Sequence, residues 1–131
     1  MKDQKLITLK SFGCSSLTLE KNIHPSPEDK NRLGLDLFIL RDATNTNLTT
    51  VRFRINAYHS EAGMSLKADY DCLFETDFDL NQEVDPEKIF KTNAAAIAFP
   101  YFRAYITQIT LLSGFPPLIL PTFNFSSTVS E

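Results

Sequence analysis

Two histidines and two cysteines are the side chains of this sequence that could most readily take part in catalysis. His59 with Glu61 or Asp71 is a candidate acid–base pair, and Cys72 beside a histidine is a candidate nucleophile. Their spacing matches no catalytic motif, and the sequence contains no GxGxxG, P-loop or HExxH pattern. We therefore expect a chain that is not an enzyme, with no catalytic residue, no cofactor and no metal site. Cys14 and Cys72 fit no CxxC spacing and are expected to be buried free thiols.

The charge of the chain argues against a general nucleic-acid binder. Its 131 residues include 13 Lys and Arg against 16 Asp and Glu, a formal net charge of −3, whereas binding to a phosphate backbone needs a basic face. The longest uncharged stretch, residues 104–130, is interrupted by polar side chains and three prolines. We therefore expect no direct insertion into a membrane. No secretory signal opens the sequence, which predicts a cytoplasmic protein.

Four segments show the alternation of a β-strand, at residues 6–20, 33–41, 48–58 and 65–78. The third and fourth alternate clearly between apolar and polar side chains, as in an antiparallel sheet with one wet face. The first alternates weakly, with Gly13 as an expected bulge or bend. The apolar positions of the third and fourth segments are Val51, Phe53, Ile55, Ala57, Leu66, Ala68, Tyr70, Cys72 and Phe74.

The connections predict how these strands are arranged. Residues 45–47 and 59–63 are short and rich in turn-forming side chains, which predicts hairpins between the second and third strands and between the third and fourth. Residues 21–31 are long and polar and contain Pro25 and Pro27. This first connection is expected to cross the sheet instead of forming a hairpin.

A long helix is predicted at residues 86–113, with Asp85 as its cap, Pro86 in its first turn and Gly114 as its stop. Pro100 lies inside it and is expected to kink it or to divide it into two shorter helices. Within the helix, a stripe that could pack on the sheet or on a partner helix consists of Phe102, Ile106, Ile109 and Leu112. Residues 115–125 form a proline-rich arm that must lie against an apolar surface. The prediction is a single α+β domain over residues 1–131, a four-stranded antiparallel sheet with a long kinked helix packed on one face.

Acidic side chains are concentrated between Asp69 and Glu87, where eight occur with no Lys or Arg. Asp69 and Asp71 alternate with Tyr70 and Cys72, which predicts that the two carboxylates lie on the wet face of the sheet. A partner-binding surface and a simple contribution to solubility both fit this pattern, and both stay open.

Two runs resemble the signature region of the SecB export chaperones. Residues 99–103 read FPYFR, where the family has an FPYAR-type helix. Residues 113–121 read SGFPPLILP, followed by Asn124 and Phe125, where the family has a GTFPQL-type loop and an APVNF-type ending. The loop is one residue shorter here, Phe102 replaces an alanine, and Pro117 replaces a polar residue. The strands before this region match the family in order and spacing.

The resemblance implies a SecB-like fold and an ATP-independent holdase that binds unfolded precursor proteins along apolar grooves. It further implies delivery of these clients to the SecA motor of the translocase, and subunits that pair into dimers and then stack through their long helices. We therefore expect a homodimer or a homotetramer. The alternative is a small-ligand or lipid-binding α+β module with a Phe-lined pocket, which predicts a closed cavity.

A binder of unfolded clients needs apolar surface and adaptable aromatic rings, because its clients have no fixed shape. Eleven Phe and four Tyr supply such rings, although any single ring is more often a core residue than a client contact. The expected client-contact residues are Phe38, Tyr58, Phe74, Phe78, Tyr101, Phe115, Leu118 and Phe123. The resemblance also implies that SecA docks on an acidic sheet face, whose expected residues are Glu20, Asp69, Asp71 and Glu75.

Family members usually continue past the Asn-Phe ending into a second helix and a polar tail, whereas this sequence adds only residues 126–131. In the family, the tail helps to contact SecA. Two kinds of partner therefore stay open for this chain, SecA itself or a dedicated client such as an antitoxin.

Overall fold

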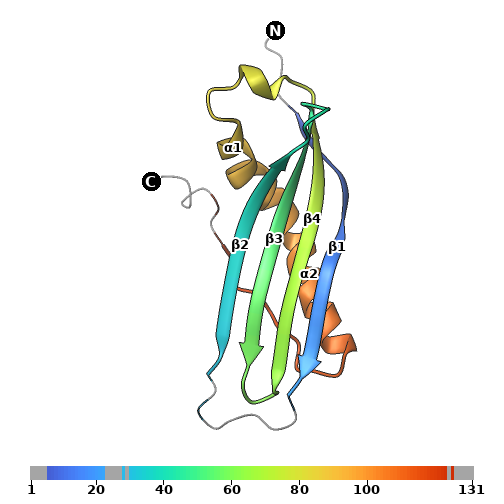
Figure 1. Cartoon of the computed structure of the whole chain (residues 1–131), viewed down its shortest axis with the longest axis vertical. Coiled ribbons are helices and arrows are strands. Elements are labelled where there is room, and N and C mark those ends of the chain that lie inside the picture. The colour runs from blue at the N-terminus through green and yellow to red at the C-terminus, as the bar shows by residue number, and fades with distance from the viewer. Residues whose placement is uncertain (1–5, 23–27, 29, 124, 126–131) are drawn as a thin grey trace.

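In a computed structural model of the chain, residues 6–22, 28, 30–123 and 125 are described. They form a four-stranded sheet with one long run of helix behind it (Figure 1). The strands are β1 (Ile7–Lys21), β2 (Arg32–Arg41), β3 (Leu48–His59) and β4 (Met64–Thr76). The helical segments are η1 (Leu80–Gln82), α1 (Pro86–Ile89), η2 (Phe90–Ala94) and α2 (Ala95–Leu112).

The strand order is β1-β4-β3-β2, and all neighbouring strands are antiparallel. Both predicted hairpins are present, and β1 and β2 lie at opposite edges, so the first connection crosses the sheet as expected. Pro25 and Pro27 lie outside the described residues. In the β2–β3 turn, Asp42 Oδ1 accepts hydrogen bonds from the backbone N–H groups of Thr44 and Asn45, which stabilises the turn locally.

The weak alternation of β1 results from two irregularities in its pairing with β4. The register shifts between Leu9 and Ser11 and again between Cys14 and Ser16. Each extra residue moves the following side chains to the other face. The bulge expected at Gly13 is therefore wrong, because Gly13 itself pairs regularly with Asp71. The side chains of β1 that share the helix-covered face are Ile7, Leu9, Phe12, Cys14, Leu17 and Leu19.

The helix begins as predicted, because the Asp85 side chain accepts a hydrogen bond from the Lys88 N–H at 3.2 Å and Pro86 occupies the first turn. Its hydrogen-bond pattern changes at η2, a π-helical segment, and Pro100 lies within α2. Because a proline ring has no N–H, the carbonyl of Ala96 loses its helical donor. Both Pro100 and Ala96 are exposed.

The core lies between the helix-covered face of the sheet and α2. Phe53 of β3 and Phe102 of α2 are both fully buried, and their rings stack at 5.0 Å and 9°. Ala94, Ala95 and Ala98 are also buried, and their small side chains allow the helix to lie close to the strands. Phe102 and Ile106 of the predicted helix stripe pack toward the sheet, whereas Leu112 at its end is 79% exposed and does not.

The arm that follows Gly114 has no helix or strand over residues 115–123, and it runs back behind β3 and β2 (Figure 1). Two threonine hydroxyls of α2 hold it in place. Thr107 Oγ1 donates to the carbonyl of Leu118 at 3.0 Å, and Thr110 Oγ1 accepts from its N–H at 2.9 Å. Beyond this point Leu120 is fully buried, so the arm is part of the core.

Candidate functional site

Of the side chains considered for catalysis, His59 and Glu61 line one pocket of about 390 Å³, whereas Asp71 and Cys72 do not line it. Asp71 forms a two-bond ion pair with Arg52, while His59 Nδ1 accepts a hydrogen bond from the Ala62 N–H at 3.3 Å. Cys72 is fully buried, and burial raises the pKa of its thiol to about 12. A thiol with this pKa stays protonated at neutral pH and is a poor nucleophile.

Both thiols are free, as expected, but Cys14 is only half-buried and its Sγ donates to the carbonyl of Ser16 at 3.2 Å. Among residues 6–22, 28, 30–123 and 125, no group of three or more His, Cys, Asp or Glu side chains is placed to hold a metal ion. None of the helices described for this chain is both long enough and apolar enough to span a membrane.

An apolar groove of about 760 Å³ runs between β1 and α2, and we call it the helix–strand groove. Phe12 of β1 and Tyr101 of α2 are 49% and 45% exposed, and their ring centroids are 4.5 Å apart. Tyr70 and Tyr105 form a second ring pair at 5.2 Å. The complete lining is Phe12, Tyr70, Pro100, Tyr101, Ala104, Tyr105, Gln108, Ile109 and Leu112.

No side chain that lines this groove is charged. Desolvation raises the pKa of Tyr70 to about 12. The pKa of Tyr105 is also raised to about 12, mainly by desolvation and to a smaller extent by a hydrogen bond with Cys14. Both phenols are therefore neutral at physiological pH. The groove thus offers apolar rings with neutral hydroxyl groups, which suits an uncharged apolar segment.

A second groove lies between α2 and the arm, and we call it the arm groove. It adjoins the helix–strand groove, with which its smaller compartment shares Pro100, Ala104 and Gln108. It consists of a compartment of about 450 Å³ and one of about 410 Å³ that share Pro100 and Arg103. The first compartment is lined by Thr92, Asn93, Ala96, Phe99, Pro100, Arg103, Thr122, Phe123 and Phe125. The second is lined by Pro100, Arg103, Ala104, Thr107, Gln108 and Ile119.

Three of the eight predicted client-contact residues lie in grooves. Tyr101 lines the helix–strand groove and Phe123 lines the arm groove. Phe115 is half-buried in a pocket of about 420 Å³ beside Leu17 and Leu19, where β1 approaches the end of α2. These three rings come from the helix and from both ends of the arm.

The other predicted contacts lie elsewhere. Phe74 is fully buried in the core, and Phe78 and Leu118 pack against the core while half-buried. Tyr58 is 8% exposed on the outer face of the sheet under the Arg32 guanidinium. These four side chains therefore pack against other parts of this chain. Phe38 is 37% exposed on the outer face of the sheet, away from the grooves, where the Arg54 guanidinium stacks on its ring at 4.9 Å.

Sequence reasoning missed several groove residues. Phe12 is the clearest case. Because β1 contains two bulges, a strict alternation of side chains along the strand does not predict the face on which Phe12 lies. Tyr101, Tyr105, Gln108 and Leu112 recur at spacings of three or four, which is the signal of a single helix face and could have identified that wall. The aromatic residues of the arm groove come together only because the arm folds back on α2.

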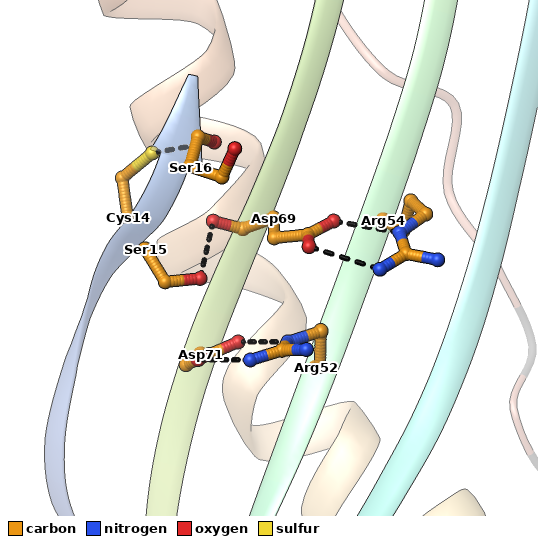
Figure 2. A network of polar contacts seen from close by, with 7 residues as sticks. All are labelled: Cys14, Ser15, Ser16, Arg52, Arg54, Asp69 and Asp71. Carbon is orange, nitrogen blue, oxygen red and sulfur yellow. Dashed lines mark hydrogen bonds and ion pairs between the residues drawn. The ribbon is translucent and has the colours of Figure 1, made fainter.

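The outer face of the sheet, opposite the helix, was expected to be acidic, and the structure shows that it is balanced in charge. Arg52 and Arg54 of β3 each form two hydrogen bonds, with Asp71 and Asp69 of β4 respectively (Figure 2). Glu75 also has a cation nearby, Lys10 at 3.7 Å. The strand register places four basic side chains here, Arg32, Arg52, Arg54 and Lys67, and five acidic ones, Glu20, Asp36, Asp69, Asp71 and Glu75. Lys10, which lies at a bulge, is a fifth basic side chain through its contact with Glu75.

The Asp69 pair predicts how stability depends on pH. A hydrogen bond from Arg54 is the main cause that lowers the pKa of Asp69 from its ordinary value of 3.8. A lowered native pKa means that the carboxylate stabilises the fold above the unfolded-state pKa, and that this contribution is lost as pH falls through the native pKa. Asp69→Asn should lower the free energy of unfolding by about 0.5–1 kcal/mol at neutral pH.

Urea unfolding across the acidic pH range measures this difference, which should disappear below the ordinary Asp range. Glu75→Gln is the matched control, since its longer and more exposed pair with Lys10 should contribute less. An Asp69→Asn penalty that persists unchanged at acidic pH would mean that packing, not the ion pair, is the cause.

Comparison with known proteins identifies the family of this chain. Residues 27–130 match the family of the preprotein translocase subunit SecB. The chain is 40% identical over 53 residues to the protein-export protein SecB of Anaplasma phagocytophilum, and 36% identical over 53 residues to an uncharacterized protein of Methanocaldococcus jannaschii. Each match covers 40% of this chain, and 33% and 34% of the two relatives, so the chain spans about a third of their length.

The fold is also similar to that of the SecB-like chaperone Rv1957 of Mycobacterium tuberculosis, solved in complex with a ChAD peptide from the antitoxin HigA1. The TM-score is 0.69 at 14% identity, and the match covers 90% of each chain. The predicted sheet-and-helix architecture and the family resemblance are both confirmed. On the match over residues 27–130, this chain belongs to the SecB family.

Proposed function

We propose that this chain is a chaperone, and more specifically an ATP-independent holdase that binds non-native polypeptides in its apolar grooves. The observation that carries the proposal is the helix–strand groove, an open channel of about 760 Å³ lined by four aromatic rings and no charged side chain. Exposed apolar surface of this kind marks a binding site in a folded protein. The groove opens to solvent along α2, which suits an extended chain better than an enclosed ligand.

The proposed clients are apolar segments of unfolded or precursor proteins. Their rings and aliphatic side chains would pack on Phe12, Tyr101 and Leu112, and their backbones would reach the neutral hydroxyls of Tyr70 and Tyr105. No step of this binding requires nucleotide hydrolysis, since burial of apolar surface supplies the free energy.

A dedicated client is favoured over delivery to SecA. The outer sheet face carries equal numbers of basic and acidic side chains, and three of its acids are already beside cations. A basic partner therefore gains little electrostatic attraction there. The fold-related Rv1957 was solved with an antitoxin peptide, which makes an antitoxin-like segment a reasonable first client to test. We place this activity in the cytoplasm.

Self-association is part of the proposal. Ile97 and Leu111 of α2 are 44% and 56% exposed, and such apolar side chains on one helix are usually covered in an assembly. We propose a homodimer or homotetramer whose interface includes α2.

The test is to dilute a chemically denatured, aggregation-prone protein into buffer with this chain and without ATP. Light scattering measures suppression, and size-exclusion chromatography with mass detection measures co-elution. The wild type should suppress aggregation and co-elute with the client. Tyr101→Ser with Leu112→Ser should weaken client binding by about tenfold or more, because buried aromatic anchors dominate such interfaces.

Phe38→Ser with Leu40→Ser is the matched control, since both residues are exposed and apolar but lie on the outer sheet face. This variant should keep full activity. If the wild type fails to suppress aggregation at several-fold molar excess, general holdase activity is wrong. If both double variants lose activity equally, the groove is not the binding site.

A further inference from the structure

The β3–β4 turn, residues 60–63, holds both ends of the connection that crosses the sheet. Directly after β1, the N–H of Asn22 donates to the carbonyl of Gly63 at 2.6 Å. Directly before β2, Asn31 Oδ1 accepts from the N–H and the hydroxyl of Ser60 at 2.8 and 3.0 Å. The two ends of the crossing connection are therefore positioned by the shape of this turn.

Gly63 shows how closely the turn and the end of β1 approach each other. Its φ is +64°, and a Cβ at this position would overlap the backbone carbonyl of Asn22. Both the positive φ and the close approach favour glycine here. The N–H of Gly63 also donates to the carbonyl of Ser60 at 3.2 Å, which closes the turn. A change in the shape of the turn would therefore move the backbone of Asn22 as well.

His59, the last residue of β3, holds the turn with its side chain. Its Nδ1 accepts a hydrogen bond from the N–H of Ala62 at 3.3 Å, in a half-buried position. Only a neutral imidazole with its proton on Nε2 can accept at Nδ1, because both nitrogens of an imidazolium carry a proton. Imidazole side chains in general change charge between about pH 5 and pH 8. Protonation in this range would remove the hydrogen bond and place two N–H groups opposite each other.

The charged groups around His59 have opposite signs. Lys21 of β1 and Glu61 of the turn line the same pocket of about 390 Å³. Arg32 of β2 lies on the outer face of the sheet, over the Tyr58 ring. Uncharged residues complete the surroundings, namely Met64 of β4, Ala62 of the turn, and Gly114, Phe115 and Pro116 where α2 leads into the arm. Since one cation and one anion act on an imidazolium in opposite directions, the main consequence of protonation is the lost hydrogen bond.

We propose that the β3–β4 turn is a pH-sensitive switch, in which protonation of His59 releases the turn and loosens both ends of the crossing connection. The switch goes beyond the proposed function and does not depend on what the grooves bind. The turn also forms one wall of the pocket that Phe115 lines. Acidification should therefore change the surroundings of this ring as well.

The experiment is nuclear magnetic resonance of the full chain at about pH 8 and about pH 5. At the higher pH, the nitrogen chemical shifts of the His59 ring should show an unprotonated Nδ1. Amide hydrogen exchange, expressed as protection factors, removes the intrinsic effect of pH on exchange. The protection of the Ala62, Asn22 and Ser60 amides should fall by about three- to tenfold on acidification, the effect of one lost hydrogen bond. The amide of Phe53, in the middle of β3, should keep its protection.

Three variants isolate the role of His59. His59→Asn places Oδ1 where Nδ1 lies, and an amide does not titrate, so the turn should stay protected at both pH values. His59→Leu has no acceptor and should show low protection at both pH values. His24→Gln removes the other histidine of the sequence and should keep the pH dependence of the wild type.

Several outcomes would contradict the switch. Equal protection of the wild type at both pH values would overturn it, as would a loss in His59→Asn as large as that in the wild type. A proton on Nδ1 at the higher pH would also overturn it, because that nitrogen could not accept from Ala62. If His59→Leu does not fold, the comparison of the wild type with His59→Asn decides. None of these measurements uses a client, so their failure leaves the proposed function unchanged.

Discussion

Replacing Phe102 with alanine should lower the free energy of unfolding by about 3–5 kcal/mol. The ring is fully buried, stacks on Phe53 at 5.0 Å, and lies 5.7 Å from Tyr70 and 6.0 Å from Phe99. Its removal leaves a cavity at the centre of the contact between β3 and α2. The SecB family pattern has alanine at this position. The substitution should nevertheless destabilise this chain, because the residues around Phe102 are packed against a larger side chain.

Urea unfolding followed by circular dichroism measures this change. Tyr101→Ala is the matched control, because Tyr101 is the preceding helix residue and is 45% exposed. Tyr101→Ala should lower the free energy of unfolding by less than about 1 kcal/mol. A similarly small cost for Phe102→Ala would show that the sheet and helix close over the space, and that the stacked pair is not central to stability.

Replacing Thr110 with valine should lower the free energy of unfolding by about 1–3 kcal/mol and loosen the arm. The Thr110 hydroxyl is fully buried, donates to the carbonyl of Ile106 at 2.9 Å, and accepts from the N–H of Leu118 at 2.9 Å. Valine has nearly the same shape but no acceptor, so the N–H of Leu118 would lose its partner in a half-buried position.

Hydrogen exchange gives the most direct measurement, because the Leu118 amide should exchange much faster in Thr110→Val than in the wild type. Thr110→Ser keeps the hydroxyl and serves as the control that should preserve protection. If the amide is equally protected in Thr110→Val, the arm is held by its buried apolar residues alone. Loss of the arm position should also weaken binding in the arm groove, since Phe123 forms one of its walls.

The charge balance of the outer sheet face could not be predicted from the sequence. The run from Asp69 to Glu87 contains eight acids and no cation, so it predicts an acidic surface. The balancing residues, Arg52 and Arg54, lie on the neighbouring strand, 19 and 15 positions away from their partners in the sequence. Only the register of β3 against β4 brings them together, and a one-residue shift would have placed them on the opposite face.

The sequence by itself determined the four strands, the two hairpins, the crossing connection and the capped helix, because alternation, turn residues and caps act between close neighbours in the chain. It also carried the signature of the SecB family. The tertiary structure alone decided which candidate rings are exposed. Phe74 lies in the core and Phe12 lines the helix–strand groove, because the burial of a side chain depends on what packs opposite it.

The tertiary structure likewise decided the two bulges of β1 and the return of the arm along α2, since both depend on hydrogen bonds between distant segments. The grooves exist where those non-local contacts leave apolar side chains uncovered. The proposed binding surface therefore follows from the packing of distant segments, which a local sequence pattern does not predict.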